Sequence, residues 1–295
     1  MDDRWATGLL GARSLVGKCV IPLLRAEGSH TFAFSRNASG CKIEARVTWL
    51  QLDTPAFPRP STPEVRDWLC VAPIWVLPQY FSMLEAYGAR RVVALSSTSR
   101  FTKTDSKDPA ENATALRLAG GEARLRAWAE SRGVEWVVLR PTLIYGQGKD
   151  KNIAEIARFV RRFGFFPLLG KAMGLRQPVH VEDVAGACVA ALKSPLAVNR
   201  AYNISGGETL PYREMVSRVF LAFQKRPRLL TIPLIVFRMA VACLRVFPRY
   251  RNWSAAMAER MNRDLVFDHA EAARDLGYAP RRFRLAPEDV APPIG

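Results

Sequence analysis

The segment GARSLVG, residues 11–17, combines residue types that can bind a pyrophosphate. Gly11 and Gly17 have the spacing of the outer glycines in a dinucleotide-binding turn. Such glycines let the backbone bend sharply and approach a pyrophosphate, whose charge the N-terminus of the next helix favours. Ser14 stands where a middle glycine is usual, and its hydroxyl can hydrogen-bond phosphate. We therefore expect the turn to bind a dinucleotide through Gly11, Arg13, Ser14, Leu15, Val16 and Gly17.

The end of the second apolar run indicates which dinucleotide binds. It reads Ser35-Arg36, without an acidic residue. A carboxylate there would bind the ribose hydroxyls of NAD, whereas an arginine can pair with the 2′-phosphate of NADP. Arg13 can add a second positive charge. The cofactor expected is NADP in preference to NAD, and the alternative is that both arginines are ordinary exposed charges.

The apolar pattern predicts the elements that position this turn. Short apolar runs at residues 5–10, 31–35, 47–53, 67–77, 89–97 and 134–141 are typical of buried strands, and helices are expected at about 14–28 and 113–132. Strands separated by helix-length connections predict an α/β fold, a doubly wound parallel sheet with helices on both faces. The second half, which opens with a helix near 151–163, predicts a smaller C-terminal lobe.

The excess of positive charge indicates which classes of partner the protein could bind. The 295 residues carry a formal net charge of +16, which implies a phosphorylated cofactor, a nucleotide-linked substrate, acidic lipid head groups or nucleic acid, or else only a solvated basic surface. We exclude nucleic acid because no zinc-finger spacing or RNP-like aromatic motif is present. Five widely separated cysteines favour neither disulfides nor a metal site. The first residues lack the basic start of a secretory signal, so a cytoplasmic protein is expected.

Residues 229–250 leave two structures open. The segment is strongly apolar, but Arg238 and Arg245 interrupt it with a spacing that puts both on one helical face. Spanning a bilayer takes about 20 predominantly apolar residues, so the segment does not span. It either lies in an anionic membrane interface, at the inner face of the membrane, or packs on the substrate lobe or against a second copy in a homodimer.

Six segments together resemble one family. They occur in the order and approximate spacing of the extended short-chain dehydrogenase/reductase superfamily, in its NAD-dependent epimerase/dehydratase group: GARSLVG, LSSTSRF, GEARLRAWAESRGVEWVVLRPTLIYGQG, RQPVHVEDVAGACVAAL, YNISGGE and DHAEAARDLGYAP. The resemblance implies an NAD(P)-binding Rossmann core over residues 1–148. It implies a substrate lobe over 149–295, with 177–204 returning to the core.

The resemblance also implies roles for individual residues. Ser97 matches the strand-end serine that touches the reacting hydroxyl or carbonyl, and Tyr145 is a second catalytic candidate. Pro141 matches the segment beside the nicotinamide. His180 and Asp183 match a motif that ties the returning chain to the cofactor domain. Further cofactor-binding candidates are Asp53, Ala72 and Pro73.

One departure from the family pattern concerns the reaction itself. Family members use a tyrosine as acid and base and, four residues later, a lysine that lowers its pKa. Aligning Glu122 with the family's glutamate puts Thr114 and Leu118 at these positions, and threonine is far too weak an acid to replace the phenol. The nearest lysines are Lys103 and Lys107 in the preceding loop, which either bend inward or remain solvated.

Two functions follow from this departure. The first is an NAD(P)-dependent epimerase, dehydratase or reductase that acts on a nucleotide-sugar or a similar hydroxyl or carbonyl compound. Its proton donor would be Ser97, Tyr145 or a group of the substrate. The second is a non-catalytic NAD(P)-binding accessory protein at a membrane surface or in a protein complex.

Overall fold

The computed structural model describes residues 6–37, 45–52, 64–104, 106, 108–237 and 260–290. Its largest feature is a seven-stranded sheet with the order β11-β6-β5-β4-β1-β2-β3, in which every pairing is parallel. The strands are β1 Ala6–Leu10, β2 His30–Ser35, β3 Val47–Gln51, β4 Asp67–Cys70, β5 Arg91–Leu95, β6 Glu135–Pro141 and β11 Arg200–Ile204. The order reverses between β1 and β4, and in open α/β sheets ligands bind outside the strand ends at such a point.

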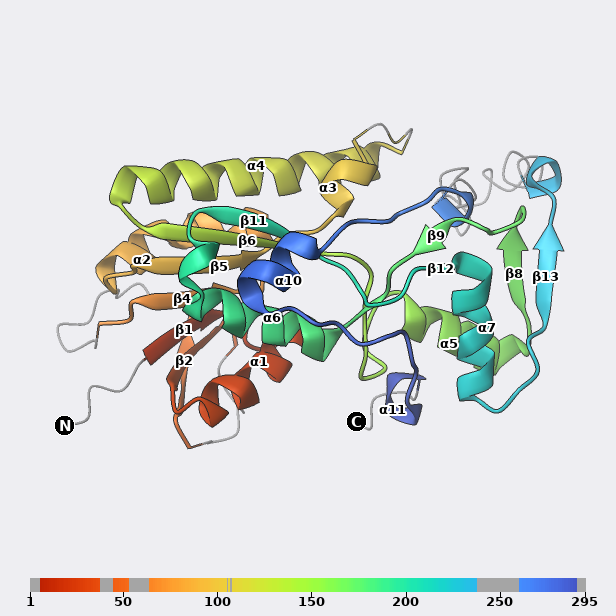
Figure 1. Cartoon of the computed structure of the whole chain (residues 1–295), viewed down its shortest axis with the longest axis horizontal. Helices are drawn as coiled ribbons and strands as arrows, with labels where there is room; N and C mark the ends of the chain where they lie inside the picture. Colours follow the sequence, from red (N-terminus) through yellow and green to blue (C-terminus); the bar gives the residue numbers. More distant parts are fainter. Residues whose placement is uncertain are drawn as a thin grey trace.

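Helices cover both faces of the sheet (Figure 1). One face carries α1 (Leu15–Ala26), α6 (Val181–Lys193) and α10 (Ala270–Leu276), and the other carries η1 (Ile74–Tyr80), α2 (Phe81–Ala86) and α4 (Pro109–Arg132). Successive strand residues enter opposite cores: Val93 and Leu95 of β5 pack with α1 and α6, whereas Val92 and Ala94 pack with η1 and α4. The predicted doubly wound fold is confirmed.

Two predicted boundaries differ from the structure. The run 67–77 is not one strand, because β4 ends at Cys70 and a 3-10 helix begins at Ile74. Pro73 has no amide to donate to a sheet and its fixed φ suits a helix start, so the chain turns there. Helix α4 begins four residues before the predicted start, at Pro109, where the Asp108 carboxylate accepts a hydrogen bond from the Ala110 amide at 3.0 Å.

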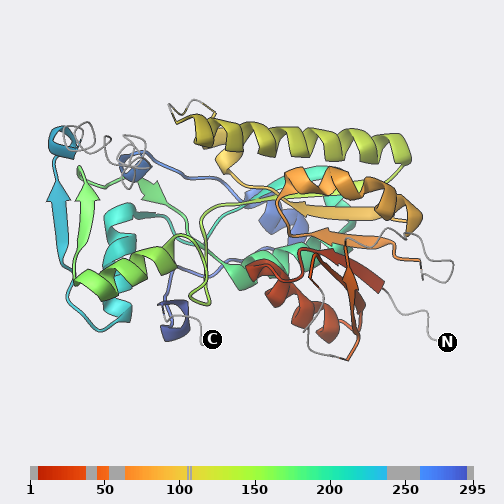
Figure 2. The same cartoon turned by 180° about the vertical axis from the view of Figure 1, so that it is seen from behind.

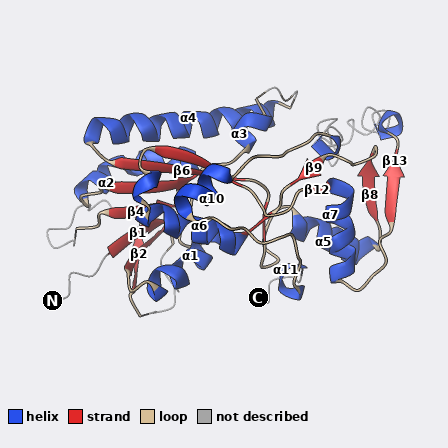
Figure 3. Cartoon of the chain, viewed as in Figure 1, coloured by secondary structure: helices blue, strands red, loops and turns tan. Residues whose placement is uncertain are grey.

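The C-terminal lobe lies beside the sheet, at the end remote from the N-terminus (Figures 1 and 2). Its helices α5 (Ile153–Phe163) and α7 (Tyr212–Ala222) share a core with the parallel pair β8 (Phe166–Leu169) and β13 (Leu229–Ile232). The remaining elements are short: α3 Ser99–Thr102, β7 Ile144–Tyr145, β9 Leu175–Arg176, β10 Val179–His180, η2 Pro195–Ala197, β12 Leu210–Pro211 and α11 Pro287–Val290. Figure 3 shows that loops make most of the connections between sheet and lobe.

No helix within the described residues is long and apolar enough to cross a membrane. Arg238 and Arg245, on which the membrane-interface prediction depended, lie outside the described residues.

Candidate functional site

The glycine turn is packed so closely that its glycines cannot carry side chains. Gly11 has φ +84°, and a β-carbon there would lie 2.6 Å from the amide nitrogen of Ala72. A β-carbon on Gly17 would lie 2.5 Å from the carbonyl oxygen of Gly11. Real β-carbons essentially never come this close to other heavy atoms, so both positions require glycine. This packing sets α1 directly on the end of β1, as a backbone cradle for phosphate requires.

Ser14 is the N-cap of α1. Its Oγ accepts a hydrogen bond from the Gly17 amide at 3.0 Å, and this leaves the hydroxyl hydrogen for a phosphate oxygen. Leu15 and Val16 form the first helical turn, where amides have no acceptor from an earlier turn. The exchange of glycine for serine therefore caps the helix without filling the space in front of its N-terminus.

Of the two arginines predicted to bind the 2′-phosphate, Arg13 lies in the glycine turn and Arg36 directly follows β2. Arg13 Nη1 donates to the Asn37 carbonyl at 2.9 Å, which joins the glycine turn to this strand end. Gln51 Nε2 donates to the Arg36 carbonyl at 2.6 Å, while the Arg36 side chain is exposed. Both arginines are thus exposed, and the Arg13 guanidinium is bound to the residue that follows Arg36.

The other predicted cofactor contacts are at neighbouring strand ends. Ala72 packs against Gly11, and Pro73 follows it. Pro141 ends β6, and its carbonyl accepts a hydrogen bond from the Thr98 amide at 3.1 Å. Asp53 lies outside the described residues.

A cavity of about 860 Å³ lies between the carboxyl ends of β5 and β6 and the C-terminal lobe. Of the predicted site residues that the structure describes, Ser97 alone lines it. Ser97 Oγ accepts the Ser99 amide at 3.1 Å. The apolar part of the wall is formed by Leu143, Ile144, Ile156, Phe159, Phe166, Met215, Met261, Leu265 and Phe267.

A buried carboxylate fixes the strand end that carries Ser97. The Glu122 side chain is 6% exposed and accepts hydrogen bonds from Ser96 Oγ at 2.5 Å and Arg140 Nη2 at 2.6 Å. It also pairs with Arg100. Both guanidiniums lie over the ring of Phe101, at 5.1 and 5.2 Å from its centroid. This cluster clamps α4 to the β5–α3 junction.

The polar part of the cavity wall holds charged residues that the sequence motifs did not reveal. Glu111 accepts from Ser106 Oγ at 2.7 Å and pairs with Arg260 at 2.6 Å and with Lys103 at 3.9 Å. Lys103, one of the two loop lysines, therefore faces the cavity, whereas Lys107 lies outside the described residues.

Arg176 is a further charged residue in the cavity wall. It is 4% exposed, and burial lowers its pKa to about 10. Its guanidinium donates to the carbonyls of Leu175 at 2.7 Å, Arg263 at 2.8 Å and Arg260, and it forms no ion pair with a carboxylate among the described residues. It also lies over the Tyr212 ring, 5.5 Å from the centroid. A buried cation without a carboxylate in ion-pair contact favours an anionic ligand. No local motif marks Arg176, because its partners lie far along the chain.

The positions aligned with the family's tyrosine and lysine have no acid or base. The Thr114 hydroxyl donates to the carbonyl of Ala110 within α4 at 2.8 Å. Leu118 is buried in the apolar core beneath η1 and α4. Thr114, at the tyrosine position, thus bonds its own helix backbone, and Leu118, at the lysine position, is a core packing residue.

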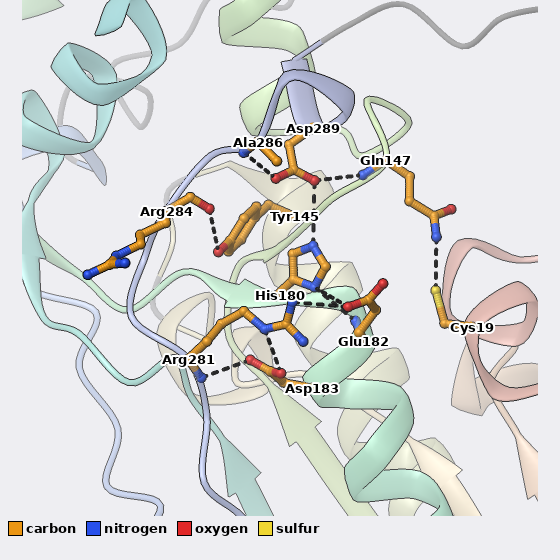
Figure 4. A network of polar contacts seen from close by, with 10 residues as sticks. All are labelled: Cys19, Tyr145, Gln147, His180, Glu182, Asp183, Arg281, Arg284, Ala286 and Asp289. Carbon is orange, nitrogen blue, oxygen red and sulfur yellow. Dashed lines mark hydrogen bonds and ion pairs between the residues drawn. The ribbon is translucent and has the colours of Figure 1, made fainter. Parts of the chain in front are cut away.

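Tyr145 lies in a network that joins β7, α6 and the last described segment (Figure 4). Its ring is fully buried against Phe283, and its hydroxyl donates to the Arg284 carbonyl at 3.3 Å. Burial raises its pKa, so the phenol holds its proton more tightly than usual. It does not line the described cavity, and this position is that of a packing residue rather than of an acid at the cavity.

The same network contains His180 and Asp183. His180 Nε2 lies 3.5 Å from Asp289, and Asp183 accepts from the Arg281 guanidinium at 2.9 Å. Burial opposes the ionisation of Asp289, but hydrogen bonds from His180 and from the amides of Ala286 and Gln147 outweigh it and lower its pKa. His180, through Asp289, and Asp183, through Arg281, thus hold the last described segment against the start of α6.

The described part of the chain contains neither a disulfide nor a cluster of metal ligands. Cys19, Cys70 and Cys188 are buried and form no disulfide. No group of three or more His, Cys, Asp or Glu residues there is arranged to hold a metal ion.

Part of the chain matches a protein-family model, and several known proteins are similar to it in sequence. Residues 79–205 match the model of the NAD dependent epimerase/dehydratase family. A UDP-glucose 4-epimerase of Vibrio cholerae is 25% identical over 60% of this chain and 52% of its own length. A 2-alkyl-3-oxoalkanoate reductase of Stenotrophomonas maltophilia is 27% identical over 66% of each chain. The mitochondrial NADH dehydrogenase [ubiquinone] 1 alpha subcomplex subunit 9 of Arabidopsis thaliana is 28% identical over 58% of this chain and 44% of its own length.

The matched part of this chain spans only about half the length of the Vibrio cholerae protein, 52%, and 44% of the Arabidopsis thaliana protein. Among solved structures, the UDP-glucose 4-epimerase of Thermus thermophilus in complex with NAD matches with a TM-score of 0.64 and 20% identity, over 93% of this chain and 94% of that one. Residues 79–205 therefore resemble the NAD dependent epimerase/dehydratase family, and the chain shares the fold of solved epimerase structures.

Proposed function

We propose that this chain is an NADP-preferring oxidoreductase or epimerase of its family, acting on a hydroxyl or carbonyl compound that carries an anionic group, such as a nucleotide-linked sugar. The observation that carries the proposal is that Ser97 and the buried guanidinium of Arg176 line the same cavity. A substrate with its reacting oxygen at Ser97 and its anionic group at Arg176 would use both of these polar groups. The apolar side chains that also line the cavity would cover the rest of the molecule.

The glycine turn fits a dinucleotide. The absent β-carbons of Gly11 and Gly17 and the capped N-terminus of α1 leave a backbone cradle for the pyrophosphate. Arg13 and Arg36 are proposed to bind the 2′-phosphate; the contact of Arg13 with the segment that follows β2 supports this, and the assignment favours NADP over NAD. Ala72, Pro73 and Pro141 are proposed to complete the contacts along the strand ends.

A nicotinamide cofactor would supply or accept a hydride at the substrate carbon, so this chain's residues must manage the proton. Because Ser97 Oγ already accepts the Ser99 amide, its hydrogen is directed to another acceptor, which we assign as the substrate oxygen. The Lys103 ammonium, held beside Glu111, would give that oxygen a proton during reduction. In the reverse direction the neutral amine would take the proton up.

The test compares two lysines that line the same cavity. Turnover would be measured with NADPH and a 2-alkyl-3-oxoalkanoate, and with NAD or NADP and UDP-glucose. Lys103→Met should lower kcat by about 10²-fold, within the range for losing a general acid, and should flatten the pH profile. Lys151→Met should change KM more than kcat, because Lys151 is exposed and forms no ion pair in the described structure. Equal losses of kcat would contradict the assignment of Lys103.

A second function is favoured by two observations: Leu118 is buried, and the Thr114 hydroxyl donates to a carbonyl of its own helix. A chain that keeps the nucleotide site but not the acid and base would serve as an accessory protein. Tight NADPH binding without turnover of either substrate class would favour this function over the enzyme.

A further inference from the structure

The far end of the C-terminal lobe carries a basic and apolar surface, which we call the lobe tip. It consists of exposed side chains from the end of α5, the α5–β8 turn and the α7–β13 connection: Arg161, Arg162, Phe163, Phe165, Lys225, Arg226, Arg228 and Leu230. The Phe166 amide donates to the Arg228 carbonyl at 2.9 Å, and β8 pairs with β13, so the segments are neighbours. Figures 1 and 2 both place this end away from the sheet.

The charge of the lobe tip is unopposed. No Asp or Glu occurs between residues 156 and 181 or between 215 and 258. Within the described residues, none of its five cationic side chains forms an ion pair with a carboxylate. Elsewhere many surface arginines are paired, as Arg126 is with Glu130 and Arg218 with Glu208. The five charges therefore add into one positive field.

The apolar side chains of the lobe tip are large and open to solvent. Phe163 is 50% exposed, Phe165 is 37% exposed and Leu230 is 54% exposed. Phe163 packs against Phe159 with ring centroids 4.6 Å apart, and the Arg162 guanidinium lies 5.2 Å from the Phe163 ring centroid. Exposed aromatic and aliphatic groups beside arginines are the composition of surfaces that enter the head-group region of a membrane.

We propose that the lobe tip docks this protein on an anionic lipid bilayer, with its five cations toward the head groups and Phe163, Phe165 and Leu230 in the interface. Nucleic acid would also attract the cations and could stack bases on the phenylalanine rings, but it would leave the aliphatic side chain of Leu230, 54% exposed, without a partner. The proposal is independent of the reaction that the cavity supports. Docking would nevertheless affect the position of that cavity. Phe159 and Phe166 pack on each other and line its wall, so this wall would lie next to the lipid.

The experiment is vesicle flotation of the full chain with phosphatidylcholine vesicles and with vesicles that also contain phosphatidylglycerol. The wild type should float only with the anionic vesicles. Arg161→Gln with Arg162→Gln should weaken the partition about 25-fold, the factor for two arginines at an anionic surface. Phe163→Ser with Phe165→Ser should abolish the binding that remains at high salt.

The matched control is Arg117→Gln with Arg124→Gln, which removes two exposed charges from α4 in the Rossmann domain. It should weaken the partition less than about two-fold, because those charges lie beyond the reach of screened attraction. The proposal is overturned if the wild type does not float or if the control weakens binding as much as the lobe-tip pair. It is also overturned if lobe-tip substitutions reduce binding of single-stranded RNA but not of vesicles. Circular dichroism would confirm that each variant is folded.

Discussion

Gly17 lies so close to Gly11 that a β-carbon at position 17 would be 2.5 Å from the Gly11 carbonyl oxygen. That oxygen is also the acceptor for the Ser14 amide at 2.9 Å, so neither the turn nor the helix can shift without losing a hydrogen bond. The close approach couples the position of α1 to the shape of the phosphate cradle.

Gly17→Ala should therefore destabilise the fold by about 1–3 kcal/mol, the cost of overpacking a well-filled site, and should also weaken dinucleotide binding. Gly120→Ala is the matched control, because Gly120 lies within α4 and a β-carbon there would meet nothing within 4 Å. It should stabilise the protein by about 0.5–1 kcal/mol through helix propensity. Chemical denaturation measures both changes, and a neutral Gly17→Ala would contradict the tight turn.

Glu122→Gln should destabilise the protein by about 3 kcal/mol. The substitution leaves the guanidiniums of Arg100 and Arg140 without their buried counter-charge. Glu130→Gln removes a carboxylate from the same helix, but its ion pair with Arg126 is half-exposed and is worth less than about 0.5 kcal/mol. Urea unfolding of the two variants separates the predictions. Similar losses would mean that the Glu122 cluster adds no more than a surface pair.

Asp275 should make stability fall at low pH. Hydrogen bonds from Arg274 and Tyr202, with the nearby charge of Arg200, lower its pKa from 3.8 to about 2. A lowered folded-state pKa stabilises the fold above the unfolded pKa, and this contribution disappears as pH falls through the folded value. The difference in unfolding free energy between wild type and Asp275→Asn should therefore be largest near neutral pH and should shrink between pH 3.8 and about 2. A difference that stays constant over that range would refute the ionic role.

The sequence predicted the parts of this protein that depend on neighbours along the chain. The strand periodicity and the glycine spacing are local patterns, and the structure places these elements at or near their predicted residues. Ser97 was named from its register in the family resemblance, and it lines the cavity. The charged cavity wall was not predictable in this way. Arg176 meets the carbonyls of Arg260 and Arg263, 84 and 87 residues away, and Glu111 meets Arg260 across the two parts of the chain.

The environment of Tyr145 could not be predicted from its aligned position. Alignment with the family placed its loop near the cofactor but gave no information on which way the ring points. Its ring packs against Phe283, and its hydroxyl donates to the carbonyl of Arg284, 139 residues later. No local pattern predicted a contact with this segment.

The most direct measurement is a tryptophan fluorescence titration of the full chain with NADPH and with NADH, repeated on Arg36→Ala. NADPH should bind more tightly than NADH. Arg36→Ala should weaken NADPH binding by about 1–3 kcal/mol, the range for losing a charge-assisted hydrogen bond, and should leave NADH binding nearly unchanged. Equal weakening of both cofactors would contradict the assignment of the 2′-phosphate to Arg36. No binding of either would contradict the nucleotide site itself.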